Sequence, residues 1–269
     1  MKQRHVFFAA FFSSMAVVLC AFGLLYMVID LRVSETDTPQ KQVPMKMPGG
    51  EDSKTVFVAM GDEETPYFFL FKFNAIQDKI GILCISPSYE WEKIGGTVQD
   101  SYEKAGVLQC ITDIQDNFGI NVDYYIQCSW RQLTQIMGGL EDFGIDELSE
   151  NLPVPIKNFL LKNAENIDAD TLINALDKAG GLLDNQLGLA FMNECAYLLI
   201  KHNLPNLCRG PGQTISDMYS RLDTNLNTRA LERFENIISF FQLSEPQFSR
   251  EIIVKGDSDG AQKAQEVFS

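Results

Sequence analysis

Three clustered carboxylates are the first residues whose types and spacing could support chemistry. Asp62, Glu63 and Glu64 directly follow "TVFVAMG", a short apolar run ending in glycine that is typical of a β-strand. Carboxylate oxygens at a strand end can hold a divalent cation such as Mg²⁺, and phosphate chemistry often requires one. The alternative is an ordinary solvated turn, because runs of charge are common at turns.

Arginines are the second group of residues that could support chemistry, because a guanidinium can make bidentate contacts to a phosphate. The candidates are Arg131, Arg229 and Arg233, with Arg209 and Arg221 as further members. Single arginines on helices usually face solvent, so each of these side chains also has a purely structural interpretation. The turn "CRGPGQ" follows no strand and is therefore a weak phosphate-binding loop.

The sequence contains few residues suited to other kinds of catalytic chemistry. The chain has only two histidines, His5 and His202, which cannot supply a histidine-based metal cluster or a Ser-His-Asp triad. No G-x-S-x-G, P-loop or G-x-G-x-x-G pattern occurs. We expect no resident cofactor.

The cysteines favour packing over chemistry. Cys84 and Cys128 lie in apolar strand-like runs and Cys110 in a helical pattern, which predicts buried thiols. Cys195 and Cys208 could form a disulfide, but their spacing alone does not decide it.

Composition indicates a globular chain that does not bind nucleic acid. With 269 residues and 45% apolar content, it is long enough for one sizeable domain and an appendage. A formal net charge of −14 repels a phosphate backbone, so DNA is not an expected partner.

The N-terminal segment predicts a single membrane span. Residues 1–5 carry Lys2 and Arg4, and Val6 to Ile29 is an uncharged apolar run long enough to cross a bilayer as a helix. Basic residues before the span favour a cytoplasmic N-terminus and place the following residues outside the cell membrane. A cleaved signal peptide is the alternative, but the apolar run exceeds its usual core length and no small-x-small site follows. Residues 30–54 mix Pro, Gly, Thr and charges and are expected to be a linker.

The remaining pattern predicts one α/β domain over residues 55–255, a mixed central β-sheet covered by helices. We expect strands at 55–61, 67–75 and 79–87, within 118–129 and at 249–256, the last returning to the sheet edge. Helical patterns cover 103–118, 130–139, 187–199 and 231–241, with a mainly helical region after 151. The tail, residues 256–269, is expected to be loose.

The aromatic strand offers a candidate apolar pocket. Because side chains alternate between the faces of a sheet, Phe69, Phe71 and Phe73 share one face while Phe68 and Leu70 share the other. The first three could line a cavity for a lipid chain. Plain core packing is the alternative, since apolar faces are usually filled.

The order of these segments resembles the LytR-CpsA-Psr family. An N-terminal anchor, a linker, "KTVFVAMGD", "YFFLFKFNAIQDKIGILCISPSYEW" and "FGINVDYYIQCSWRQLTQIMGGL" follow that family's pattern over Thr55 to Asp146. Looser similarities are "LGLAFMNECA" to the family's "ALAYVR-x-R" and "TRALERFENII" to its arginine-rich "R-x-x-RQ" helix.

The resemblance implies an extracytoplasmic α/β/α domain with an apolar pocket for a polyprenyl chain. It further implies transfer of a glycan or teichoic-acid-like polymer to the cell wall, with Mg²⁺ and arginines at the pyrophosphate. Members would act at the membrane of a bacterium, here most simply a Gram-positive one.

Four departures from the family pattern remove charged groups from that site. The family's "SIPRD" is "SPSYEW" here, and its "RSDT"-like run is "EETPYFF". "QIMGGL" lacks the aspartate before the glycine pair, and "FMNECA" places Asn193 and Glu194 where arginines are expected. We therefore expect a binding or assembly factor that is not an enzyme. The alternatives are a divergent transferase using Asp62, Glu63 and Glu64 for Mg²⁺ with Arg131, Arg229 and Arg233 for phosphate, and a structural anchor whose pocket is filled.

Overall fold

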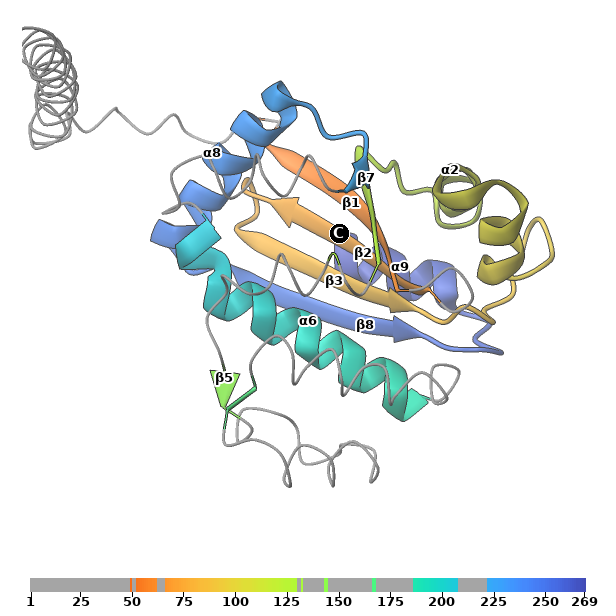
Figure 1. Cartoon of the computed structure of the whole chain (residues 1–269). Coiled ribbons are helices and arrows are strands. Elements are labelled where there is room, and N and C mark those ends of the chain that lie inside the picture. The colour runs from red at the N-terminus through yellow and green to blue at the C-terminus, as the bar shows by residue number, and fades with distance from the viewer. Residues whose placement is uncertain are drawn as a thin grey trace, which may run out of the picture. The chain divides into compact units, whose positions relative to one another are not determined.

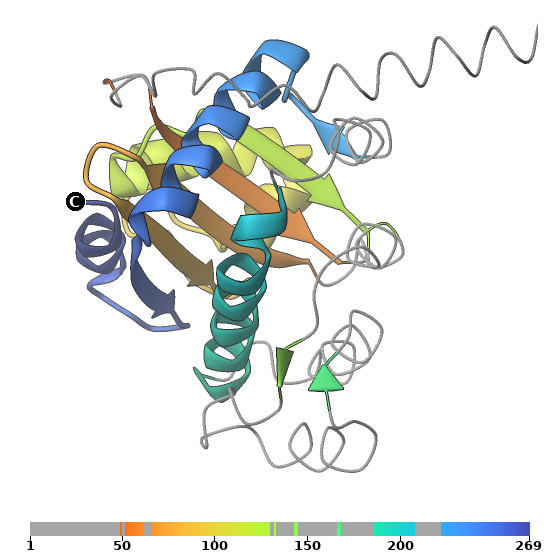
Figure 2. The ribbon, with the colours of Figure 1, turned by 90° about the vertical axis from the view of Figure 1, so that its left-hand side faces the viewer.

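A computed structural model describes residue 49 and residues 52–61, 66–129, 132, 143–144, 166–167, 186–207 and 222–269. All of them except 143–144 and 166–167 contribute to, or adjoin, one sheet and its flanking helices (Figures 1 and 2). No helix among the described residues is both long and apolar enough to cross a membrane. The expected span at 6–29 and most of the expected linker lie outside the described residues.

A mixed six-stranded sheet forms the centre, with the strand order β7-β4-β1-β2-β3-β8. Its members are β1 (Ser53–Met60), β2 (Tyr67–Asn74), β3 (Lys79–Ile85), β4 (Tyr124–Cys128), β7 (Asp223–Thr224) and β8 (Gln247–Ile253). β2 is antiparallel to β1 and β3, whereas β4 is parallel to β1 and β8 is parallel to β3. β7 is antiparallel to β4. A separate two-stranded sheet joins β5 (Phe143–Gly144) to β6 (Asn166–Ile167).

Helices lie on both faces of the sheet (Figures 1 and 2). One face carries α2 (Val98–Phe118) and α9 (Gly260–Phe268), which share a core with Phe57, Leu70 and Leu83. The other face carries α6 (Gln186–Leu207) and α8 (Thr228–Ser244), which pack on Ile80 and Ile82. The described domain is therefore a three-layer α/β/α sandwich, which confirms the predicted α/β class with a mixed sheet.

The start of α2 is defined by a capping box. The Thr97 hydroxyl accepts a hydrogen bond from the Asp100 amide at 3.1 Å, and the Asp100 carboxylate accepts one from the Thr97 amide at 2.7 Å. The helix is interrupted at Ala105 and Gly106, where Gly106 adopts a φ of 66°. The sequence predicted a helix only from Glu103, because its apolar stripe begins with the segment after this break. The residues from Val98 to the break form a separate segment across the kink, so they do not continue that stripe.

The expectation of a loose tail at 256–269 is wrong. Residues 260–268 form α9, and Ala264, Val267 and Phe268 are buried against the sheet and α2. The domain therefore extends beyond the predicted boundary at Lys255. The prediction failed because α9 is only nine residues long and the strand β3, which Val267 and Phe268 contact, is far away in sequence. The return of residues 247–253 to the sheet edge as β8 is confirmed.

Candidate functional site

An aromatic row crosses the face of the sheet that α6 and α8 cover. We use this name for Phe69, Phe71, Phe73, Phe234 and Tyr124. Ring centroids are 5.7 Å apart for Phe69 and Phe71, 6.5 Å for Phe71 and Phe73, and 5.5 Å for Phe73 and Phe234. Tyr124 continues the row at 5.7 Å from Phe234. The three predicted phenylalanines thus share one face, as strand alternation requires.

The aromatic row is buried to different degrees along its length. Phe69 is 2% exposed, whereas Phe71, Phe73, Phe234 and Tyr124 are half-buried. Phe68 and Leu70 lie in the core on the opposite face. Sequence reasoning missed Phe234 and Tyr124 as members of the row. The signal for Phe234 was its place in the apolar stripe of the helix at 231–241, but the stripe alone does not reveal which strand it meets.

The loop after β3 fills the core instead of offering charge. Tyr89 and Trp91 are 1% and 2% exposed and pack on Phe118, with Trp91 and Phe118 centroids 5.5 Å apart. The Trp91 indole donates to the Ser101 hydroxyl at 2.8 Å, and the Ser88 amide donates to the Ser86 hydroxyl at 3.2 Å. The segment "SPSYEW", which differs from the LytR-CpsA-Psr pattern, therefore contributes Tyr89 and Trp91 to the hydrophobic core.

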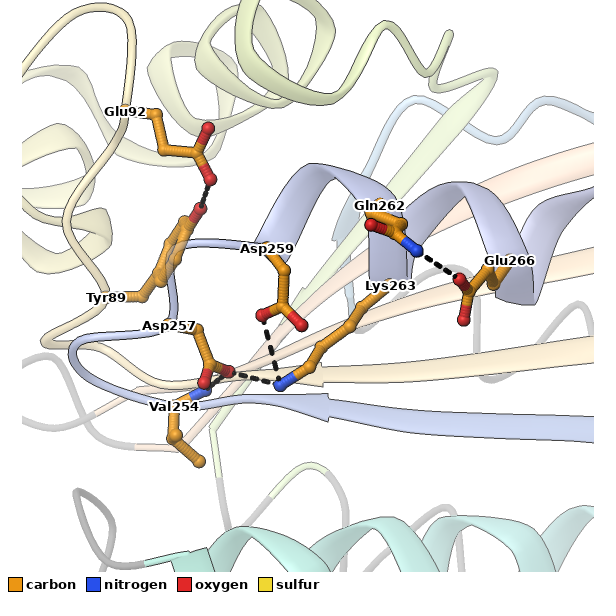
Figure 3. Close-up of polar contacts among 8 residues, drawn as sticks. All are labelled: Tyr89, Glu92, Val254, Asp257, Asp259, Gln262, Lys263 and Glu266. Atoms are coloured by element: carbon orange, nitrogen blue, oxygen red, sulfur yellow. Dashed lines mark hydrogen bonds and ion pairs between the residues drawn. The ribbon is translucent and has the colours of Figure 1, made fainter.

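Two aspartates in the connection from β8 to α9 are paired with a lysine (Figure 3). Lys263 lies 2.7 Å from a carboxylate oxygen of Asp257 and 3.5 Å from one of Asp259. Burial lowers the Lys263 pKa, but the hydrogen bond and charge of Asp257 outweigh it, so the net pKa is raised. Burial, reinforced by Glu92, raises the pKa of Tyr89, whose hydroxyl lies 3.3 Å from Glu92. Lys263 therefore offsets part of the aspartate charge and, with the Val254 amide that donates to Asp257, stabilises the connection from β8 to α9.

The two α6 residues at the expected arginine positions have structural partners. The buried Asn193 amide donates to the Glu251 carbonyl of β8 at 2.6 Å. Glu194 forms an ion pair with Arg250 at 2.7 Å, and the Arg250 guanidinium lies 4.1 Å from the Tyr197 ring centroid. Both residues join α6 to β8, and neither supplies a cation for a phosphate.

Two of the arginine candidates lie on α8, near the start of β1. Arg229 is exposed and Arg233 is half-buried, both in the first two turns of α8. Phe234, next to Arg233, contacts Phe73 and Tyr124, which pair with Lys54 and Val56 near the start of β1.

Several candidates fall outside the described part of the chain. They are Asp62, Glu63, Glu64, Arg131, Cys208, Arg209 and Arg221. Within the residues that the structure describes, no group of three His, Cys, Asp or Glu side chains could hold a metal ion. The magnesium site of the transferase alternative therefore remains a prediction.

The described cysteines are buried free thiols, as predicted for three of them. Cys84, Cys110, Cys128 and Cys195 are all buried. Burial raises the pKa of Cys110 and of Cys128 to about 12, so these thiols are protonated and unreactive at neutral pH. Burial, followed by the charge of Glu194, raises the pKa of Cys195 as well.

Comparison with known proteins finds similar structures but no similar sequence. No protein-family profile matches the sequence, and no curated protein sequence matches it either. A protein from Eubacterium siraeum described as a transcription regulator is 13% identical, with a TM-score of 0.62 over 86% of this chain and 97% of its own. TagT bound to LIIa-WTA is 12% identical, with a TM-score of 0.60 over 86% of this chain and 96% of its own.

A third similar structure is ywtF from Bacillus subtilis, described as a transcriptional regulator. It is 13% identical, with a TM-score of 0.57 over 86% of this chain and 96% of its own. At these identities the similarity concerns the fold. The α/β/α sandwich of this chain is the fold that TagT and these two proteins share.

Proposed function

We propose that this chain is a membrane-anchored LytR-CpsA-Psr-like protein of a bacterial cell envelope. In this proposal residues 6–29 span the cytoplasmic membrane, the N-terminus is cytoplasmic and the α/β/α domain lies outside the membrane. The domain binds or assembles prenyl-linked wall polymers without transferring them. The fold shared with TagT, a LytR-CpsA-Psr family wall teichoic acid transferase, supports an envelope function. A net charge of −14 opposes the DNA-binding role that the regulator labels of other similar proteins suggest.

One observation carries the non-catalytic part of the proposal. The positions that would hold the family's charged groups are used for packing and internal pairing: Tyr89 and Trp91 are buried, Asn193 bonds to Glu251, and Glu194 is paired with Arg250. Transfer from a pyrophosphate must stabilise charge on the leaving group. Loss of a single stabilising group commonly costs about 10²–10³ in rate.

The aromatic row is the proposed contact surface for the prenyl chain. Its half-buried members, Phe71, Phe73 and Phe234, are partly exposed apolar side chains whose rings contact one another in series. Hydrocarbon bound there would be stabilised by about 25 cal/mol for each Å² of apolar surface removed from water. Such binding is non-directional, so it would retain a lipid without orienting its pyrophosphate for reaction.

The binding experiment is lipid co-purification from native bacterial membranes with mass spectrometry. Full-length protein should retain a polyprenyl-linked species, and Phe73→Ala with Phe234→Ala should release it. Phe248→Ala is the matched control, because Phe248 is half-buried on the same face of the sheet but outside the aromatic row. If the double variant and the Phe248→Ala control retain the same amount of lipid, the aromatic row is not the lipid-binding surface.

The catalytic experiment separates the proposal from its alternative, a divergent transferase using Mg²⁺. Purified protein supplied with a prenyl-pyrophosphate-linked glycan and Mg²⁺ should show no transfer or pyrophosphate release. Turnover that disappears in a combined Arg131→Ala, Arg229→Ala and Arg233→Ala variant would establish an enzyme with a relocated site. For topology, protease added to intact protoplasts should digest the domain, and complete protection would reverse the proposed orientation.

A further inference from the structure

A second pocket, of about 440 Å³, lies on the face of the sheet opposite to the aromatic row. It opens between the ends of α2 and α9. Its polar lining residues are Ser53, Thr55, Lys72, Asn121, Asp123, Gln265 and Ser269, and apolar walls come from Phe118, Ile120 and Phe268. We call it the α2–α9 pocket. Its volume falls within the range of about 300–1,000 Å³ that is typical of small-molecule sites.

The pocket exists because the covering helices stop before the sheet does. Thr55 and Lys72 are direct cross-strand partners. Strand alternation places them on the face that carries Phe57 and Leu70 further along the same strands. α2 ends at Phe118 and α9 ends at Phe268, so the inner face of the sheet changes from apolar to polar at this point. Polar residues are expected where the covering layer ends and the sheet meets solvent. Here they also line a pocket.

The charges around the pocket disfavour both simple anions and simple cations. The Asp123 carboxylate accepts hydrogen bonds from the Thr55 amide at 2.8 Å and from Lys54 at 3.5 Å. The C-terminal ends of α2 and α9 add negative potential, which repels an anion. The Lys72 ammonium, which donates to the Phe268 carbonyl, repels a cation. Burial lowers the Lys72 pKa, with Lys79 contributing, as expected for an ammonium partly removed from water.

We propose that the α2–α9 pocket binds a neutral carbohydrate unit of one or two rings. Sugar hydroxyls both donate and accept, so one ligand can bond to Lys72, Thr55 and Asn121 as donors and to Asp123 as an acceptor. The carbon–hydrogen face of a sugar ring can pack on the apolar wall formed by Phe118 and Phe268. This site is separate from the aromatic row, and its test does not depend on lipid binding there.

The experiment is ligand-observed saturation-transfer NMR on the full-length protein. The probes are N-acetylglucosamine and glucose, with methyl phosphate and methylammonium as charged comparators. Lys72→Met removes the ammonium and keeps an unbranched stem, whereas Thr55→Val removes the hydroxyl and keeps the β-branched shape. Lys79→Met is the matched control, because Lys79 also donates to carbonyls at the end of α9 but does not line the pocket.

At least one sugar should bind, and both pocket variants should weaken its Kd about tenfold or more, because a ligand hydrogen bond is lost. Lys79→Met should leave the Kd unchanged. Absence of sugar binding up to about 50 mM, a range that covers the weakest useful affinities, would overturn the proposal. Equal binding by wild type and Thr55→Val would also overturn it, as would preference for methyl phosphate or methylammonium.

Discussion

The contact between α9 and β3 provides a sharp test of how the domain is held together. Gly81 lies in the buried strand β3, and α9 packs directly above it. A Cβ atom at this position would lie 2.8 Å from Phe268 Cδ1 and 2.9 Å from Val267 Cγ1. Both distances are shorter than normal van der Waals contacts, so a Gly81→Ala substitution must displace the Phe268 and Val267 side chains or shift α9.

The expected cost follows from two opposing effects. Overpacking of a well-packed core typically costs about 1–3 kcal/mol. Replacing glycine with alanine also restricts the unfolded chain, which returns about 0.4–1 kcal/mol. We therefore expect Gly81→Ala to lower the free energy of unfolding by about 1–2 kcal/mol. In a domain of this size that corresponds to a fall in Tm of roughly 2–8 °C.

A double-mutant cycle tests the cause. Phe268→Ala alone removes a buried aromatic side chain, which costs about 3–5 kcal/mol. It also removes the closest atoms that the new methyl group would meet. In the Phe268→Ala background, Gly81→Ala should therefore cost less than half of what it costs in the wild type, a non-additivity expected of residues in contact. Urea unfolding followed by circular dichroism measures each corner of the cycle. Equal costs in the two backgrounds would show that α9 does not pack on Gly81.

Three further predictions concern α2 and the cysteines. Thr97→Ala should lower the free energy of unfolding by about 1 kcal/mol through loss of the capping box, whereas Thr112→Ala, the same change on an exposed turn of α2, should cost less than half of that. Hydrogen bonds from Thr97 lower the Asp100 pKa, so its contribution is present above its unfolded pKa and is lost as pH falls through its folded pKa. The difference in urea midpoint between wild type and Asp100→Asn should therefore shrink from pH 7 to strongly acidic pH, and a constant difference would contradict the capping role. Cys110 and Cys128 should resist maleimide at pH 8 until urea unfolds the domain, as mapped by mass spectrometry, because burial raises the pKa of each to about 12; rapid labelling of the folded protein would exclude this burial.

Local patterns were sufficient to predict most strands of the sheet, although β7 and the strand order were not predicted. β1, β2 and β3 are apolar runs separated by polar turns, and such runs carry their own periodicity and end signals. The face shared by Phe69, Phe71 and Phe73 also followed from alternation alone. These features depend on residues close together in sequence, so a single chain reveals them.

The rest depended on long-range contacts that a sequence does not display. Nothing within "SPSYEW" shows that Tyr89 and Trp91 enter a core with Phe118, although their apolar bulk could have suggested burial. The arginines of α8 were matched to a phosphate site by motif, but the helix meets the sheet near the start of β1. The α2–α9 pocket arises only where two helices end above the same strands.

The position of α9 in the chain constrains when this domain can fold. Lys72 and Phe268, whose ammonium and carbonyl are bonded, are separated by 196 residues in sequence. The inner surface of β3 is covered by α9, and the outer edge of β3 is paired by β8. During synthesis β1, β2 and β3 emerge first, and their apolar faces stay incomplete until residues 247–268 leave the ribosome. A stable fold of this domain therefore forms only after nearly the whole chain has been synthesised.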